Sequence, residues 1–237
     1  MNHRIHYRSL LPIYSLVLFL FFLAGIGGSH AVDVFQNNIP VKRNSQILID
    51  AGHGGVDGGA STPDGKKESD INLEIALRLE DLCHFLGMET VMIRRTDTSI
   101  HTNGESISQK KISDLKERVR IANASQFATV ISIHQNYFSD SRYSGAQVFY
   151  GNGESANDLA VKLQTALRSY LNPGSNRKAK KADGIYIMEK MKGLGVLVEC
   201  GFLSNPEEAA KLQTKTYQEK ICAVIATTVS QFLTEKK

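Results

Sequence analysis

Four side chains that can bind a metal ion or move a proton lie beside the ends of expected strands and helices. His53 sits in a glycine-rich stretch after an apolar run, and His134 directly follows the apolar run 128–133. Glu199 follows Val-Leu-Val, and Glu68 stands just ahead of an expected helix. Two histidines and a carboxylate at such positions form the kind of set that binds zinc tetrahedrally and leaves a fourth position to water.

Metal-assisted amide hydrolysis is the reaction class that this set favours. Bound zinc lowers the pKa of its water to about 7 and polarises a carbonyl, and a nearby carboxylate can pass the water's proton to the leaving amine. Glu199 is placed for that second role, because a carboxylate after a buried apolar run must be paired or functional. Other interpretations stay open at this point. A single histidine after a strand is commonly structural, a glutamate ahead of a helix commonly caps it, and no H-E-x-x-H motif is present.

The stretch 46–60, Q-I-L-I-D-A-G-H-G-G-V-D-G-G-A, organises the rest of the chain. It begins with a short aliphatic run typical of a buried strand and then carries five glycines around one histidine. Glycines let the backbone turn tightly and approach a ligand closely. The stretch therefore predicts a strand followed by a ligand-binding loop, and a tight turn with a solvent-exposed histidine is the alternative.

Alternating strands and helices predict the fold class. Apolar runs indicate strands, and three- and four-residue apolar spacing indicates helices: strands over 47–49, 89–93, 128–133, 145–150 and 196–198, and helices over 71–86, 155–171 and 217–232. This order predicts a single α/β domain with a mostly parallel twisted sheet flanked by helices. Ligands bind beyond the carboxyl ends of the strands in such sheets, so the four candidate side chains can converge there.

Two boundaries carry local signals. Ser69 or Asp70 can cap the first helix. The polar region 94–112 is expected to form an exposed loop near the active face, and Asp114 with Glu117 offers a capping signal for the helix after it.

Residues 1–31 are expected to form a signal peptide or an N-terminal membrane anchor. Basic residues precede an apolar run there, and Ser29-His30-Ala31 resembles a cleavage site. The polar stretch 32–45 is expected to be a linker, and 46–237 the catalytic domain. We therefore expect an exported protein, secreted or anchored outside the cytoplasmic membrane, with a possible N-terminal membrane association.

Composition excludes several classes of protein. The chain has 237 residues, of which 42% are apolar and 22% charged, as expected for one globular domain and not for a disordered chain. Its 28 basic residues nearly balance its 24 acidic ones, which gives no case for nucleic-acid binding. The three cysteines Cys83, Cys200 and Cys222 include no C-x-x-C pair and are expected to be buried free thiols.

Four motifs, in this order, resemble those of the zinc-dependent N-acetylmuramoyl-L-alanine amidases, a family that includes bacterial cell-separation and sporulation autolysins. They read I-D-A-G-H-G-G-V-D-G-G-A, K-E-S-D-I-N-L, S-I-H-Q-N and V-L-V-E-C-G-F-L-S-N. The resemblance implies that His53, Glu68 and His134 hold one zinc ion and that Glu199 is the catalytic carboxylate. It also implies that the substrate is peptidoglycan, cut between the lactyl group of N-acetylmuramic acid and the L-alanine of the stem peptide.

Within that family the chain is most similar to the spore-cortex, germination-specific amidases, because it is short, has one N-terminal apolar segment and carries no wall-binding repeat. That likeness implies spore cortex maturation in the forespore intermembrane space or cell wall, where a downstream muramic acid deacetylase completes muramic-δ-lactam. Gln135 and Cys200 depart from the residues commoner in the family. No autoinhibitory helix is evident, which suggests that activity is limited either by zinc loading or by an accessory activator protein. Two alternatives remain: a non-catalytic peptidoglycan-binding regulator with this fold, and a zinc peptidase acting on wall peptides.

Overall fold

Strands and helices alternate along the part of the chain that the computed structural model describes, residues 46–124 and 129–236. The elements are β1 (Gln46–Ala51), α2 (Glu68–Phe85), β2 (Glu89–Met92), α3 (Ile107–Ala124), β3 (Thr129–Asn136), β4 (Gln147–Tyr150), α4 (Glu154–Tyr170), β5 (Lys180–Lys181), α5 (Tyr186–Lys190), β6 (Gly195–Phe202), α6 (Pro206–Leu212) and α7 (Lys215–Glu235). The expected signal or anchor (1–31) and linker (32–45) lie outside the described residues. None of the described helices combines the length and the apolar character needed to span a bilayer.

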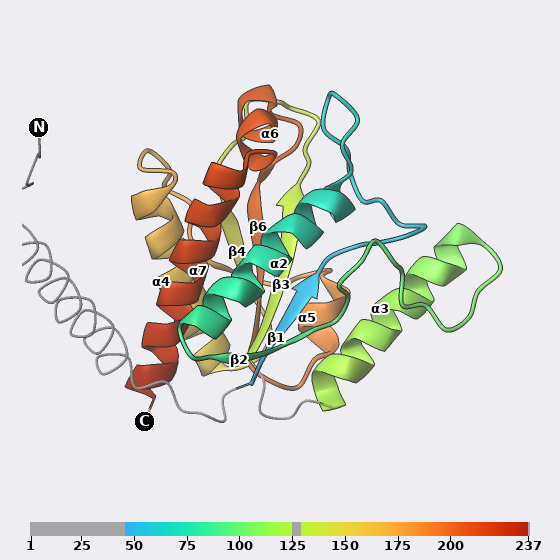
Figure 1. The fold of residues 1–237 in the computed structure, drawn as a ribbon, viewed down its shortest axis with the longest axis horizontal. Coiled ribbons are helices and arrows are strands. Elements are labelled where there is room, and N and C mark those ends of the chain that lie inside the picture. The colour runs from blue at the N-terminus through green and yellow to red at the C-terminus, as the bar shows by residue number, and fades with distance from the viewer. Residues whose placement is uncertain (1–45, 125–128, 237) are drawn as a thin grey trace, which may run out of the picture. The chain divides into compact units, whose positions relative to one another are not determined.

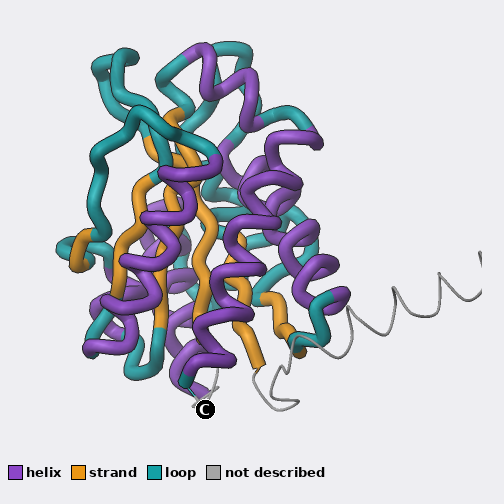
Figure 2. Tube along the Cα trace, turned by 90° about the vertical axis from the view of Figure 1, so that its left-hand side faces the viewer, coloured by secondary structure: helices purple, strands orange, loops and turns teal. Residues whose placement is uncertain are grey.

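The strands form one six-stranded sheet in the order β2-β1-β3-β6-β4-β5. The pairs β1 with β2, β1 with β3 and β3 with β6 are parallel, whereas β4 runs antiparallel to β6. The predicted α/β fold with a mostly parallel sheet is therefore confirmed. Long loops gather at the carboxyl edge of the parallel strands, opposite the end of α7 (Figure 1, Figure 2).

Helices pack on both faces of the sheet. On one face, α2, α4 and α7 cover alternate strand residues such as Ile47 and Ile49 and form the larger core (Figure 1). On the other face, α3 and α5 cover Leu48, Val130 and Leu197. Because β1 and β3 are buried on both faces, their apolar residues run continuously and do not alternate with polar ones. This packing fixes the strand ends that carry the candidate site.

The helix after the polar region begins earlier than predicted. The sequence suggested an exposed loop over 94–112 with a cap at Asp114, but α3 already starts at Ile107. Ser106 and Gln109 form a reciprocal cap, in which Gln109 N donates to Ser106 Oγ and Ser106 N donates to the Gln109 side chain. Asp114 is buried inside the helix and accepts hydrogen bonds from Ile100 N and the Arg118 guanidinium.

The start of α2 also differs from the sequence expectation. Neither Ser69 nor Asp70 caps the helix, because Glu68 is already its first residue. Carbonyls of the glycine-rich loop accept the first helical N–H groups instead: Glu68 N donates to Ala60 O at 2.8 Å, and Ser69 N donates to Gly58 O at 3.1 Å. The loop therefore caps the helix and leaves the Glu68 side chain available for the site.

Candidate active site

Three of the candidate side chains meet at the carboxyl edge of the sheet. His53 follows β1, Glu68 opens α2, and His134 lies within β3. His53 Nε2 lies 3.3 Å from Glu68 Oε1, and His134 Nδ1 lies 3.1 Å from the same oxygen. One donor atom from each residue lies within 4.8 Å of the others. Two imidazoles and a carboxylate at this separation have the donor chemistry of a zinc site with an open position.

The glycines of the loop make room for these side chains. A Cβ on Gly52 would lie 2.2 Å from the His134 ring, and one on Gly59 would lie 2.5 Å from Glu68 Oε2. His53 itself has φ +59°, and no other described non-glycine residue has a positive φ. This left-handed conformation is uncommon for a residue with a side chain and needs support from its surroundings.

The Glu68 carboxylate is fixed by donors from three directions. Ala60 N donates to its Oε2 at 3.0 Å, and Gln135 N donates to its Oε1 at 3.1 Å. The Asn72 side-chain amide donates to Oε1 at 3.3 Å and also to Gly52 O. Burial raises the pKa of Glu68, but hydrogen bonds with both histidines outweigh it and hold that pKa far below its usual range. Glu68 is therefore an oriented, ionised carboxylate.

Asp57 orients the first histidine. His53 Nδ1 donates to Asp57 Oδ2 at 2.9 Å, and Asp57 Oδ1 pairs with Lys111 Nζ of α3 at 2.8 Å. Burial lowers the pKa of His53, but the bonds to Asp57 and Glu68 outweigh it and raise that pKa to about 9. With the proton on Nδ1 held by Asp57, Nε2 faces Glu68. In metal sites, an imidazole that binds the metal through one ring nitrogen commonly donates its other N–H to a carboxylate.

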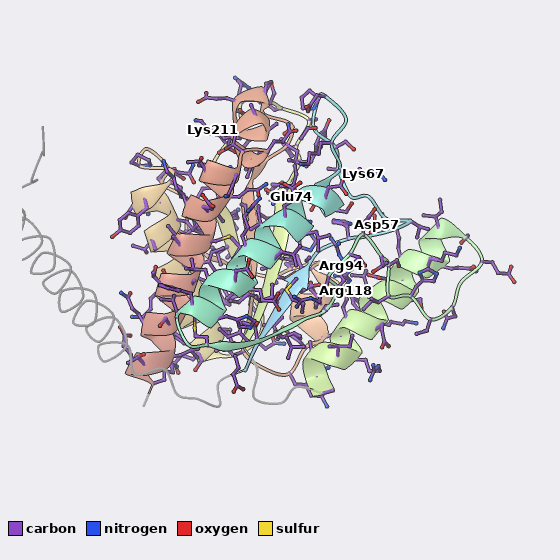
Figure 3. All side chains as sticks on the ribbon, viewed as in Figure 1. Asp57, Lys67, Glu74, Arg94, Arg118 and Lys211 are labelled. Atoms are coloured by element: carbon purple, nitrogen blue, oxygen red, sulfur yellow. The ribbon has the colours of Figure 1, made fainter. Side chains whose placement is uncertain are left out.

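Two buried arginines hold the loop from beneath. Arg118 of α3 donates to His53 O at 2.6 Å and to Ala51 O at 2.9 Å, and it pairs with Asp50 and with Asp114. Figure 3 labels Arg118 and Asp57 between this loop and α3.

Arg94 supplies the second anchor (Figure 3). It is only 3% exposed, although the sequence placed it in an exposed loop. Its guanidinium donates to Ala51 O at 2.8 Å, to Gly52 O at 2.9 Å and to Ser69 O at 2.8 Å. The difference from the sequence expectation has a clear cause: three backbone carbonyls converge at the turn, and one planar guanidinium reaches all of them at once.

Glu199 lies next to His134, because the two residues are partners in the register of β3 and β6. Its Oε2 is buried and has no hydrogen-bond partner among the described residues. Burial raises the pKa of Glu199 to about 7, against the opposing effect of His134. A buried, unpaired carboxyl oxygen beside three side chains that could hold a metal ion fits a site completed by a ligand or substrate.

The two residues that depart from the family pattern are both buried. Gln135 is 3% exposed, and its side-chain amide donates to Asn72 Oδ1 at 3.1 Å. Gln135 thus orients Asn72, whose amide donates to the Glu68 carboxylate.

Cys200 is fully buried, as are Cys83 and Cys222, and all three are free thiols, as predicted. Burial raises the pKa of the Cys83 and Cys222 thiols to about 12.

Comparison with known proteins places this geometry in a family. The family model described as N-acetylmuramoyl-L-alanine amidase matches residues 47–231. A germination-specific N-acetylmuramoyl-L-alanine amidase from Bacillus subtilis is 40% identical over 193 residues, which cover 80% of this chain and 80% of the relative. LytC, another amidase of that organism, is 30% identical over 180 residues, which cover 76% of this chain but 34% of the relative.

Solved structures agree with the sequence matches. The CwlD amidase from Clostridioides difficile, solved in complex with the GerS lipoprotein, superposes with a TM-score of 0.77 at 37% identity and covers 81% of this chain and 100% of that one. An N-acetylmuramoyl-L-alanine amidase from Clostridium difficile 630 superposes with a TM-score of 0.71 at 26% identity and covers 83% of this chain and 100% of that one. The chain thus belongs to the N-acetylmuramoyl-L-alanine amidase family of peptidoglycan hydrolases.

Proposed function

We propose that this amidase is zinc-dependent, with His53, Glu68 and His134 as the zinc ligands and Glu199 as the catalytic carboxylate. The observation that carries the proposal is the convergence of three donor atoms within 4.8 Å of one another, beside a buried carboxyl oxygen without a partner. Two imidazoles and one carboxylate form a donor set that suits a catalytic zinc ion. Structural zinc sites, which are closed, mostly use cysteine thiolates instead.

The chain's own residues account for the proton transfers. The chemistry that zinc supplies when bound is polarisation of the amide carbonyl and a lower pKa for the attacking water. Glu199 accepts the proton of that water at Oε2 and delivers it to the amine nitrogen of L-alanine as the carbon–nitrogen bond breaks. A pKa of about 7 suits both steps, because the group can hold and release a proton near neutral pH.

Two variants test the assignment by different readouts. We expect His134→Ala to lose metal binding in a chelator competition and to lose hydrolysis of purified muropeptides. Glu199→Gln should keep metal binding and lose about 10²–10⁴-fold in turnover. Hydrolysis by His134→Ala at the rate of the parent protein would reject the ligand assignment. Retained turnover in Glu199→Gln would reject the catalytic role.

Product analysis separates the amidase from its two alternatives. The proposed reaction releases complete stem peptides and leaves N-acetylmuramic acid without a peptide. A zinc peptidase would leave part of the peptide on the sugar, and a non-catalytic regulator would bind muropeptides without releasing anything. Mass spectrometry of the products, with zinc, with other divalent ions and with a chelator, distinguishes all three and identifies the metal.

We further propose a role in spore cortex maturation. The support is the germination-specific relative, which is 40% identical over four fifths of both chains. Removal of stem peptides would provide the substrate on which a muramic acid deacetylase completes muramic-δ-lactam. The test is the muropeptide profile of spores that lack this protein: muramic-δ-lactam should be absent, and a normal profile would reject the role.

An accessory protein and export complete the proposal. The solved CwlD amidase is in complex with the GerS lipoprotein. We propose that this chain likewise works with an accessory partner outside the cytoplasmic membrane, delivered there by residues 1–31. Affinity purification from sporulating cells should recover such a partner. Fractionation should find the chain outside the cytoplasm, and a purely cytoplasmic pool would contradict export.

A further inference from the structure

Three exposed aromatic side chains lie beside the site and have no part in the mechanism above. Tyr137, Phe138 and Tyr143, which we call the aromatic platform, are 57%, 49% and 46% exposed. All three lie in the segment that joins β3 to β4. Clustered exposed aromatic rings mark contact surfaces more often than accidents of folding, because they leave apolar area in water.

The platform is a supported surface. The rings of Phe138 and Tyr143 meet edge to face with centroids 4.8 Å apart. Tyr143 also lies 6.2 Å from the ring of Phe202, which is only 3% exposed and is itself covered by the Arg177 guanidinium at 4.8 Å. The exposed rings of Phe138 and Tyr143 therefore rest on a buried aromatic residue.

Backbone contacts tie the platform to the loop after Glu199. Phe138 N donates to Ser204 Oγ at 3.1 Å, and Asn205 Nδ2 donates to Ser141 O at 2.9 Å. Rings that are held before a ligand arrives lose little conformational freedom on binding. The platform is thus preorganised for contact with a ligand.

The platform continues the active-site edge of the sheet. Tyr137 follows His134 by three residues, a distance of about 10 Å along an extended chain. Phe202 ends β6 and follows Glu199 by three residues. A polymer whose scissile amide lies at the site has further units within reach of these rings.

Charge indicates which part of a peptidoglycan substrate, the stem peptide or the glycan strand, suits the platform. The stem peptide carries carboxylates, which call for unpaired cations. Two cations of this region already have partners: Arg142 pairs with Asp140 at 2.7 Å, and Arg177 donates to Ser144 O while it covers Phe202. A sugar whose lactyl group is still joined to the stem peptide as an amide carries no charge of its own, and the C–H face of its ring suits the electron-rich faces of aromatic rings.

We propose that the aromatic platform binds the glycan strand of peptidoglycan, with sugar rings packed on Tyr137, Phe138 and Tyr143 while the adjacent amide enters the active site. The proposal rests on the proposed amidase function for its substrate. The platform acts in substrate affinity.

Binding of peptide-free glycan strands to the full chain, in salt that screens their free lactyl carboxylates, tests this without any turnover. Tyr137→Ala and Phe138→Ala should each weaken that binding roughly 2- to 13-fold, the range for one lost aromatic contact. Tyr137→Phe, which keeps the ring, should retain it. Phe85→Ala is the matched control: Phe85 is 77% exposed at the end of α2, just before β2 begins at the opposite edge of the sheet.

Kinetics give a second readout. For polymeric peptidoglycan the two alanine variants should raise KM and leave kcat unchanged, whereas hydrolysis of a single N-acetylmuramoyl-peptide should not change. Unaltered glycan binding by both alanine variants would overturn the proposal, as would an equal loss on the single-sugar substrate or binding of free stem peptide to the platform. Glycan binding needs no hydrolysis. A protein that binds glycan through the platform but hydrolyses nothing would therefore refute the proposed zinc-dependent hydrolysis and leave the glycan proposal intact.

Discussion

Replacing Arg118 by methionine tests how the loop that carries His53 is held. The Arg118 side chain is 3% exposed and faces Asp50 and Asp114, which are 1% and 10% exposed. Methionine has a similar length but leaves two buried carboxylates without their cation. Removing one partner of a buried ion pair costs about 3–5 kcal/mol, a large share of a typical unfolding free energy of about 5–15 kcal/mol.

Urea unfolding of the chelator-treated protein measures this loss without a contribution from bound metal. For an m value of about 2 kcal/mol/M, the midpoint should fall by about 1.5–2.5 M. Arg120→Met is the matched control on the same helix, because Arg120 is exposed and pairs only with Glu117, and its midpoint should not move. A loss below about 1 kcal/mol for Arg118→Met would refute the view that this cation holds two buried carboxylates.

The pH dependence gives the sign of the effect. Burial raises the pKa of Asp50, but Arg118 and further contacts outweigh it and hold that pKa below 3.8. Asp50 therefore stabilises the fold above pH 3.8, and this contribution is lost as pH falls through the folded-state pKa. Without Arg118, burial dominates and the pKa rises above 3.8. The destabilisation by Arg118→Met should then be smaller at pH 4.5 than at pH 7, and an equal or larger loss at pH 4.5 would contradict this account.

Three further predictions concern the site and the core. Asp57→Asn should weaken metal binding about 10–100-fold in a chelator competition, and unchanged affinity would show that its bond to the histidine is dispensable. Gly59→Ala should abolish metal uptake, because its Cβ would lie 2.5 Å from Glu68 Oε2, whereas Gly65→Ala, with φ +90° but nothing within 4 Å of its Cβ, should lose stability only. All three cysteine thiols are buried with raised pKa values, so they should resist alkylation until the protein unfolds; rapid labelling of the native chain would argue against the packed core.

The parts of the fold that the sequence predicted well are those with local signals. The buried strands β1, β3 and β6 are continuous apolar runs, and residues 46–60 show both the end of β1 and the turn that follows it. The order of elements was enough to bring His53, Glu68, His134 and Glu199 to one edge. The strand boundaries were less certain, because β3 continues through the polar residues up to Asn136, where backbone pairing with β6 sustains the strand.

Long-range polar contacts were not predictable in the same way. Arg118 lies 68 residues from Asp50, and Arg94 lies 43 residues from Ala51. The spacing of residues in the sequence does not show which guanidinium contacts a carbonyl or carboxylate on another element. Both arginines therefore look like ordinary polar residues in the sequence. The prediction for the start of α3 was wrong for a different reason. The sequence does contain a capping box there, Ser106-Ile107-Ser108-Gln109, but the prediction used Asp114 instead.

These contacts explain how the left-handed backbone of His53 is held with its ring at the candidate site. Sparsely populated backbone conformations cost about 1–3 kcal/mol and persist only where neighbouring contacts fix them. His53 is fixed at its carbonyl by Arg118 and at its ring by Asp57, and both anchors connect to α3, the second through Lys111. The two anchors differ in kind, because the first also compensates two buried carboxylates, whereas the second pairs with the imidazole and with the more exposed Lys111. Loss of Arg118 should therefore lower stability and metal affinity together, whereas loss of Asp57 should lower metal affinity with little effect on stability.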